Sequence, residues 1–502
     1  MSLVLGLDIG TSGGRALIAD AEGRRIGSAS RPWRYRSEAP GYAELDTATV
    51  WASLASAVRE AVRTSLARPD AIQAVAVTSQ RAGVVLRDAK GDVLHAASNV
   101  DARGVSEGIA LERAHRDLVY STAGRLPVLM HLPARLAWFR ANRPEFAARI
   151  THAQSFADWC ASRLTGGEAN VTDPSLAAEM MLYDIAHGWW SDALCDALGV
   201  SRRMLPQVSR HATTAGRLPE DVAREFGLHP GTPVVIAGAD TQCAALGAGI
   251  YDPGAAAVVA GTVLPVQQVT GAVVLDEDRR LWTSPHVVPN RWVIEAGCGD
   301  AGAAVDYLLA LMGRGGDYGW LELAVSRCEP GAGGVTFFDP GPIHSGNYPL
   351  VRRGGLLFPT PVLAVGRGQE DIVRAAYESI AYASRAGLEW LEEAGGAQSE
   401  VAVCGGLARS STFARIVASV LGRTVRRTRE PNISALGACV VGAAAAGLHS
   451  TIAAAAAAMH DRGEIVHPLA DWGVLYDGLY GTWRERRTRF EETLMRVNEV
   501  PE

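Results

Sequence analysis

The sequence predicts an α/β protein built from two domains. A chain of 502 residues is longer than most single domains. Residues 3–30 alternate short apolar runs with glycine-rich turns, which is typical of three strands, and a helix pattern and a buried strand follow. Residues 255–270 repeat the strand–turn–strand pattern, so we expect a second domain in the second half of the chain.

The order of predicted elements places the domain boundary near residue 250. A helix over 49–62 is predicted by apolar residues at Val50, Leu54, Val58 and Val62, which share one helical face. Apolar runs predict further strands, and a glycine pair later interrupts a strand–helix pattern. The expected domains are residues 1–250, residues 251–445 and a helical C-terminal segment, 446–502.

Composition excludes several classes of partner. The net charge is −6 and the chain has no basic run, so we expect no nucleic-acid partner. No stretch is long and apolar enough for a membrane span, and the N-terminus carries no basic leader, so we expect no membrane partner and no signal peptide. Seven dispersed cysteines without a CxxC pair indicate reduced thiols in the cytoplasm.

The segment DIGTSGGR, after the first strand, is rich in glycine and hydroxyl groups. Glycine lets backbone N–H groups approach a phosphate, and Gly10, Thr11, Ser12 and Arg15 follow one another closely here. Asp8 ends the strand and could hold Mg²⁺ directly or through water. The alternative is an ordinary hairpin turn with a capping aspartate.

Asp240 closes the apolar strand pattern VVIAGAD and opens a helix of small residues. A carboxylate at a strand–helix junction points into a cleft, where it could accept the proton of an attacking hydroxyl. The alternative is a helix N-cap, a frequent role of aspartate.

Two further turns have a composition suited to a nucleotide. Gly261 and Thr262 end a strand in the second half and mirror the first hairpin. Gly405 and Gly406, with Ser410 nearby, stand between a strand and a helix, where a turn can pass beneath a flat adenine ring while the helix N-terminus faces a phosphate. The alternative for these glycines is a tight connecting turn.

Together these segments resemble the two phosphate hairpins and the adenosine elements of the actin-like ATPase superfamily. More closely, the chain is similar to FGGY carbohydrate kinases over residues 3–445, on the quoted hairpin and on VTSQRAGVVL, NVDAR, IAGADTQCAALGAG and VCGGLARSSTFARIV. The resemblance implies two ribonuclease-H-like domains with the active site in the cleft between them. It implies ATP and Mg²⁺ as cofactors, Asp240 as the catalytic base, and a sugar bound by Gln80, Arg81, Asp101 and Arg103, with Asp240.

The substrate implied by the resemblance is a small sugar or polyol. The xylulokinase and autoinducer-2 kinase branches are favoured, so a ketopentose or the autoinducer-2 precursor is expected. Gln80-Arg81 is nearer to the Gln-Arg of glycerol kinases and the Met-Arg of autoinducer-2 kinases than to the Met-His of xylulokinases, which leaves a glycerol- or erythritol-type polyol open. For Arg81 and Arg103 the alternative is ion pairing at the surface or between domains, and a homodimer is also left open.

The chain has a single lysine, Lys90. This argues against kinase folds that need a lysine at a set position. A P-loop needs a lysine after glycine in GxxxxGK[ST], and Lys90 lies in the turn DAKGD without that spacing. Two other classes remain as alternatives. An actin-like ATPase without a sugar substrate would share the hairpins, and a silent sugar sensor would often carry an added DNA-binding segment, for which we see no sign.

Overall fold

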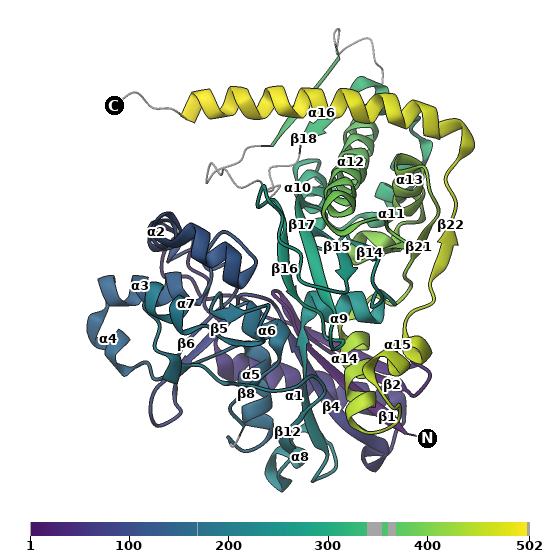
Figure 1. Ribbon diagram of the computed structural model, residues 1–502. Helices are drawn as coiled ribbons and strands as arrows, with labels where there is room; N and C mark the ends of the chain where they lie inside the picture. The colour runs from purple at the N-terminus through teal and green to yellow at the C-terminus, as the bar shows by residue number, and fades with distance from the viewer. Residues whose placement is uncertain (1, 168, 339–353, 360–367, 499–502) are drawn as a thin grey trace.

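The computed structural model describes residues 2–167, 169–338, 354–359 and 368–498, and a mixed sheet forms the centre of each half (Figure 1). In the first sheet the strands follow the order β12-β13-β4-β1-β2-β3, with β1, β2 and β3 antiparallel and β1, β4 and β13 parallel. Its strands are β1 (Leu3–Ile9), β2 (Gly13–Asp20), β3 (Arg25–Pro32), β4 (Ile72–Ser79), β12 (Thr214–Arg217) and β13 (Pro233–Ala239).

The second sheet repeats this topology. Its order is β16-β17-β15-β14-β20-β21-β22, again an antiparallel group joined to parallel strands through β14 and β20. Its strands are β14 (Ala255–Val259), β15 (Val263–Thr270), β16 (Trp282–Pro285), β17 (Trp292–Asp300), β20 (Glu400–Cys404), β21 (Val425–Arg427) and β22 (Glu464–Val466). The strand–turn–strand pattern that the sequence repeats is thus a repeat of structure.

Helices α9 (Asp240–Gly247) and α14 (Ile433–Ala445) lie between the two sheets (Figure 1). Side chains alternate across a strand, so Val4 faces this layer while its neighbours face away. The layer is close-packed: a Cβ on Gly437 would lie 1.8 Å from the carbonyl oxygen of Cys243. Small residues therefore allow one pair of helices to pack against the sheets of both domains.

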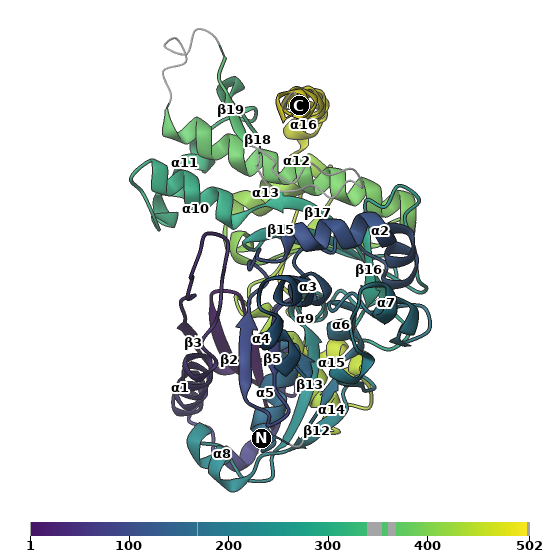
Figure 2. The same ribbon diagram turned by 90° about the vertical axis from the view of Figure 1, so that its left-hand side faces the viewer.

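Outer helices complete the two cores (Figure 2). Helix α1 (Thr47–Ser65) buries the predicted face of Val50, Leu54 and Val58 against the first sheet, together with α5 (Phe156–Leu164). Helices α12 (Gln369–Gly395) and α13 (Ser411–Leu421) cover the second sheet. The long helix α16 (Ala470–Asn498) packs on α12 and α13.

A smaller unit extends from the first domain alongside strand β16 (Figure 1). It holds α2 (Val105–Ala123), α3 (Leu132–Asn142), α4 (Pro144–Arg149), α6 (Pro174–Ala178), α7 (Asp192–Ala197), β5 (Val84–Arg87), β6 (Val93–Ala97) and β7 (His152–Gln154). The backbone N–H of Thr283 donates to Gly124 across this contact at 2.7 Å.

The other elements are α8 (Glu220–Phe226), α10 (Gly302–Leu311), α11 (Tyr318–Arg327), α15 (Ile452–Met459), β8 (Val171–Thr172), β9 (Tyr183–Asp184), β10 (Trp189–Trp190), β11 (Gln207–Val208), β18 (Thr336–Phe338) and β19 (Gly355–Leu357). In the described part of the chain, none of the helices has the length and apolar character that crossing a membrane requires.

Candidate active site

Three strands of the first sheet end at the same edge. Parallel strands β1, β4 and β13 place their carboxyl ends together, with Asp8 in register with Thr78 and Thr78 in register with Gly238. Asp240 begins helix α9 directly after β13, and Gln80 follows β4. This is the edge at which open α/β sheets bind ligands.

The carboxyl of Asp240 has a pKa above the usual range of an aspartate. Burial raises the pKa of its carboxyl to about 7, and the negative charge of Asp8 adds to the rise, while Arg81 opposes it. Its Oδ1 accepts a hydrogen bond from the Thr241 hydroxyl at 3.1 Å. A base with a pKa near the working pH is suited to take a proton from a hydroxyl.

Asp8 has one carboxylate oxygen occupied and one free. It is 3% exposed, and its Oδ2 accepts a hydrogen bond from Arg15 Nη1 at 2.9 Å, as the register of β1 and β2 dictates. Its Oδ1 is buried and has no hydrogen-bond partner among the described residues. Burial raises the pKa of this carboxyl, although Arg15 counteracts the rise. A free carboxylate oxygen at this edge fits one ligand of Mg²⁺.

The first hairpin has a tight turn that hydrogen bonds stabilise. The N–H of Gly10 donates to Gly13 at 3.0 Å, and a Cβ on Gly10 would lie 2.8 Å from Arg15 Nη1. The Thr11 hydroxyl donates to Asn99 at 3.2 Å, while Ser12 is exposed. A side chain at Gly10 would thus displace the end of Arg15, and Ser12 is open to a ligand.

The turn of the second hairpin contacts the glycine pair that follows strand β20. Within the turn between β14 and β15, the N–H of Gly261 donates a hydrogen bond to the carbonyl oxygen of Val263 at 3.2 Å, and Thr262 is exposed. Gly405 has a φ of +93°, and a Cβ there would lie 2.6 Å from the Ala260 carbonyl oxygen. Gly406, next in the chain, is exposed with open space where a Cβ would be. The structure therefore brings these two predicted segments into contact.

The hydroxyl of Ser410 is already committed. Its Oγ accepts from the N–H of Phe413 at 2.9 Å, which caps helix α13, and it donates to Glu322. The carboxylate of Glu322 also accepts from Thr412 at 2.7 Å. A nucleotide contact of Ser410 stays a prediction.

Arg81 joins the two domains. Its guanidinium donates to both oxygens of Glu295, at 2.8 and 2.9 Å, and lies over the ring of Trp282. Burial lowers the pKa of Arg81. The negative charges of Glu295, Glu179 and Asp240 raise it by more than burial lowers it, so the net shift of the pKa is upward. Gln80 is 1% exposed, and its Oε1 accepts from Ser98 at 2.8 Å.

Arg103 and Asp101 form a buried pair. Arg103 Nε donates to Asp101 Oδ1 at 2.8 Å, and its Nη2 donates to Glu44 at 2.7 Å. Aromatic rings, among them Tyr42 with its centroid 4.7 Å away, surround the guanidinium. Ion pairing, the alternative left open by the sequence, is thus found for both arginines, and sugar contacts by Gln80, Arg81, Asp101 and Arg103 stay predictions.

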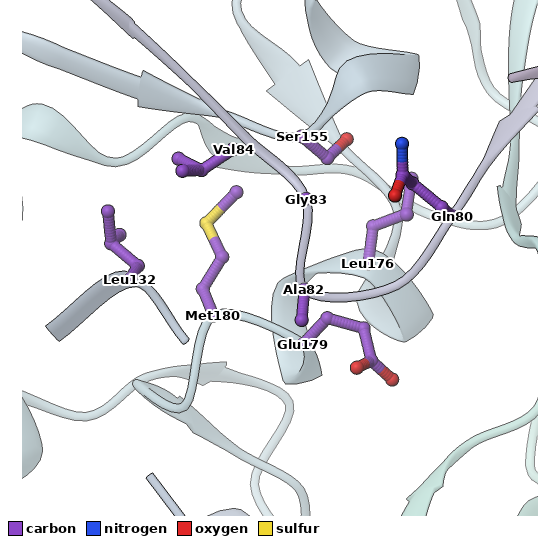
Figure 3. A pocket seen from close by; sticks show the side chains of 9 residues that line it. All are labelled: Gln80, Ala82, Gly83, Val84, Leu132, Ser155, Leu176, Glu179 and Met180. Carbon is purple, nitrogen blue, oxygen red and sulfur yellow. The ribbon is translucent and has the colours of Figure 1, made fainter. Parts of the chain in front are cut away.

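A small pocket opens beside the strand end that carries Arg81 (Figure 3). The lining is mostly apolar, with three polar side chains in it; the lining residues are Gln80, Ala82, Gly83, Val84, Leu132, Ser155, Leu176, Glu179 and Met180. The space that it encloses has room for about one water molecule, well below the roughly 300–1,000 Å³ typical of ligand pockets.

Sequence reasoning missed Glu179 and Glu295, which shape the site. Neither stands in a glycine-rich turn, and Glu295 is 214 positions from its partner. The available signal was a single carboxylate within an apolar run, LAAEMMLY for Glu179 and WVIEAG for Glu295. Such isolated carboxylates are rarely buried without a partner.

Two sheets of one topology around a shared helical layer, with carboxylates at the strand ends, define the actin-like ATPase fold. Models of the FGGY family of carbohydrate kinases match the chain over residues 3–247 for the N-terminal domain and 256–446 for the C-terminal domain. The chain belongs to this family and is an ATP-dependent carbohydrate kinase, a phosphotransferase. The predictions of fold, family and enzyme class are confirmed.

Relatives span nearly the whole chain. An autoinducer-2 kinase from Enterobacter sp. (strain 638) is 29% identical, covering 96% of this chain and 94% of its own. One from Klebsiella pneumoniae is 30% identical, covering 90% and 87%. A xylulose kinase structure from Rhodospirillum rubrum has a TM-score of 0.85 at 24% identity, covering 98% of this chain and 99% of that chain. At that identity the structural likeness shows the fold.

Proposed function

We propose that the enzyme phosphorylates a hydroxyl of a small ketose, either a xylulose-type ketopentose or the autoinducer-2 precursor. The observation that carries this proposal is Asp240, a carboxyl with a pKa of about 7 beside Asp8 at the strand-end edge. The autoinducer-2 kinases at about 30% identity support the substrate class. The glycerol- or erythritol-type polyol is the alternative on the same machinery.

In the proposed reaction Asp240 removes the proton of the attacking hydroxyl. The substrate oxygen forms a bond to the γ-phosphorus of ATP while the bond from that phosphorus to the bridging oxygen breaks, and ADP leaves. The proton stays on Asp240 until solvent takes it. Such base catalysis contributes about 10²–10⁴-fold, and positioning contributes much of the rest.

The remaining residues position the phosphates. The turns at Gly10, Thr11 and Ser12, with Arg15, and at Gly261 and Thr262 would offer donors to phosphate oxygens, and Gly405, Gly406 and Ser410 would border the adenosine. Mg²⁺, held by Asp8 directly or through water, would neutralise charge on the phosphates. Arg15 keeps one oxygen of Asp8 occupied, which leaves Oδ1 for that role.

The proposal keeps the division of the chain at residue 250, with a C-terminal segment from 446 that packs on both domains. It places the enzyme in the cytoplasm, where ATP is available, and it leaves a homodimer open.

An ADP-release assay coupled to NADH oxidation tests the proposal. The panel contains D-xylulose, L-xylulose, D-ribulose, dihydroxypentanedione, glycerol and erythritol, each with ATP and Mg²⁺. We expect turnover with a ketopentose or dihydroxypentanedione and little ADP release without sugar. Rapid sugar-independent hydrolysis, or turnover with glycerol alone, would contradict the proposed substrate class.

A further inference from the structure

Glu179 holds an unused hydrogen-bond acceptor in the wall of the pocket. The residue follows helix α6 and is 4% exposed. Its Oε2 lies 2.6 Å from Nη1 of Arg125, and both side chains are almost fully buried. Its Oε1 is buried without a hydrogen-bond partner among the described residues. The guanidinium nitrogens of Arg125 also have no hydrogen-bond partner among the described residues, so the contact is an ion pair that holds the carboxylate by charge and leaves one oxygen free.

A buried acceptor without a partner is costly, because it has lost water and gained nothing in exchange. Native structures keep such groups where a ligand or an ordered water completes them. Figure 3 shows the Glu179 carboxylate extending away from the apolar side chains of Met180 and Leu132. The carboxylate therefore lies apart from these apolar members of the pocket lining.

Glu179 also lies close to the reacting groups. Its negative charge is one cause of the upward pKa shifts of both Asp240 and Arg81. It shares the pocket lining with Gln80 and Ala82, the two chain neighbours of Arg81. A substrate that presents one hydroxyl to Asp240 would place a second hydroxyl beside Glu179, and a hydroxyl is about the size of the one water for which the pocket has room.

We propose that Oε1 of Glu179 accepts a hydrogen bond from a second hydroxyl of the substrate and so determines specificity. The inference rests on the proposed function and narrows its substrate class to a neutral, polyhydroxylated ketose. A carboxylate accepts hydrogen bonds and donates none, so it strengthens the binding of a substrate with a hydroxyl at this position. An analogue without that hydroxyl binds more weakly, and the carboxylate of a sugar acid is repelled. Arg125 acts as a positioning residue, because it fixes the orientation of Glu179.

Glu179→Gln tests this role. The amide oxygen of glutamine would turn to Arg125, so an NH₂ group would replace the acceptor at the position of Oε1. Sugar binding without ATP, measured by isothermal titration calorimetry, reports on the pocket independently of turnover. The probes are D-xylulose, its monodeoxy analogues, dihydroxypentanedione and D-xylonate. The control is Glu220→Gln on the exposed helix α8.

We expect Glu179→Gln to weaken binding of D-xylulose or dihydroxypentanedione about 10–100-fold, the range for a lost hydrogen bond to a charged group. One monodeoxy analogue should bind the native protein equally weakly and lose nothing further in the variant. D-Xylonate should bind the native protein at least about 10-fold more weakly than D-xylulose. Glu220→Gln should change none of these constants more than about twofold.

Equal weakening of every probe by Glu179→Gln, or equal binding of D-xylonate and D-xylulose, would overturn the inference. So would the absence of binding by both neutral sugars at millimolar concentration. If glutamine at this position prevents folding, Glu179→Asp withdraws the acceptor by one methylene, and the same loss is expected. Sugar binding that depends on Glu179 without ADP release would contradict the proposed function alone. ADP release with a ketose whose binding is unchanged by Glu179→Gln would contradict this inference alone.

Discussion

Cutting the ion pair between Arg81 and Glu295 should loosen the contact between the two domains. Arg81 follows strand β4 of the first sheet, and Glu295 lies in strand β17 of the second. Two parallel hydrogen bonds join them, and the side chains are 16% and 5% exposed. Charge-assisted, bidentate pairs with little solvent are the strong class of ion pair.

The structure sets the expected magnitude. Removing one partner of a buried pair leaves the other charge uncompensated and costs about 3–5 kcal/mol. Gln267 also donates to Glu295, at 2.7 Å, so Arg81→Ala should lie near the lower end of that range. Glu295→Ala leaves Arg81 over the ring of Trp282 without its carboxylate. The coupling energy of the double mutant should be about 1–3 kcal/mol.

The coupling energy is obtained from urea unfolding of four proteins: the native protein, both single variants and the double variant. The free energy of unfolding is taken from the first unfolding transition of each. The matched control is the pair Arg224–Glu220, also at 2.9 Å but more than two-thirds exposed on both sides. Its coupling should be below about 0.5 kcal/mol. Additive effects for Arg81 and Glu295 within about 0.5 kcal/mol would refute the interdomain ion pair as a source of stability.

Two further predictions concern buried carboxylates. Asp8→Asn should weaken the apparent affinity for Mg²⁺ in the kinase assay about 10–100-fold while sugar binding by calorimetry stays unchanged; an unaltered Mg²⁺ dependence would contradict the role of its free oxygen. Asp158, 1% exposed, has its pKa raised to about 7 by burial. Since the unfolded group titrates near 4, the native state binds the extra proton, and its contribution to the free energy of unfolding falls as pH rises from about 4 to 7. Asp158→Asn should remove up to about 2.6 kcal/mol of that pH dependence in urea unfolding at pH 5 and 8, and an identical slope in the variant would contradict the assignment.

Local patterns were enough to predict the framework of the site. Asp8 and Asp240 could be placed because each ends an apolar strand pattern, and parallel strands bring their ends to one edge. The glycine-rich hairpins were visible for the same reason: a tight turn restricts which residues fit. The repeat of topology followed from the repeat of the pattern.

Contacts between distant segments could not be predicted in this way. The partner of Arg81 is set by how strand β17 lies against the first domain, which no local spacing encodes. Ser410 was assigned to the nucleotide by its neighbours, yet its hydroxyl caps a helix and donates to Glu322, which lies in α11. Glu179 carried no motif, because its role depends on which of its oxygens is left free.

The most direct test of the account compares Asp240→Asn with the native enzyme in one preparation. Asparagine keeps the shape of the side chain but accepts no proton from the substrate at this position. We predict ATP affinity within about threefold of native and sugar-dependent ADP release reduced at least about a hundredfold. The native kcat/KM should also fall as pH drops below about 7, because protonated Asp240 is inactive. Near-native turnover by Asp240→Asn would contradict the assignment of the base and with it the proposed mechanism.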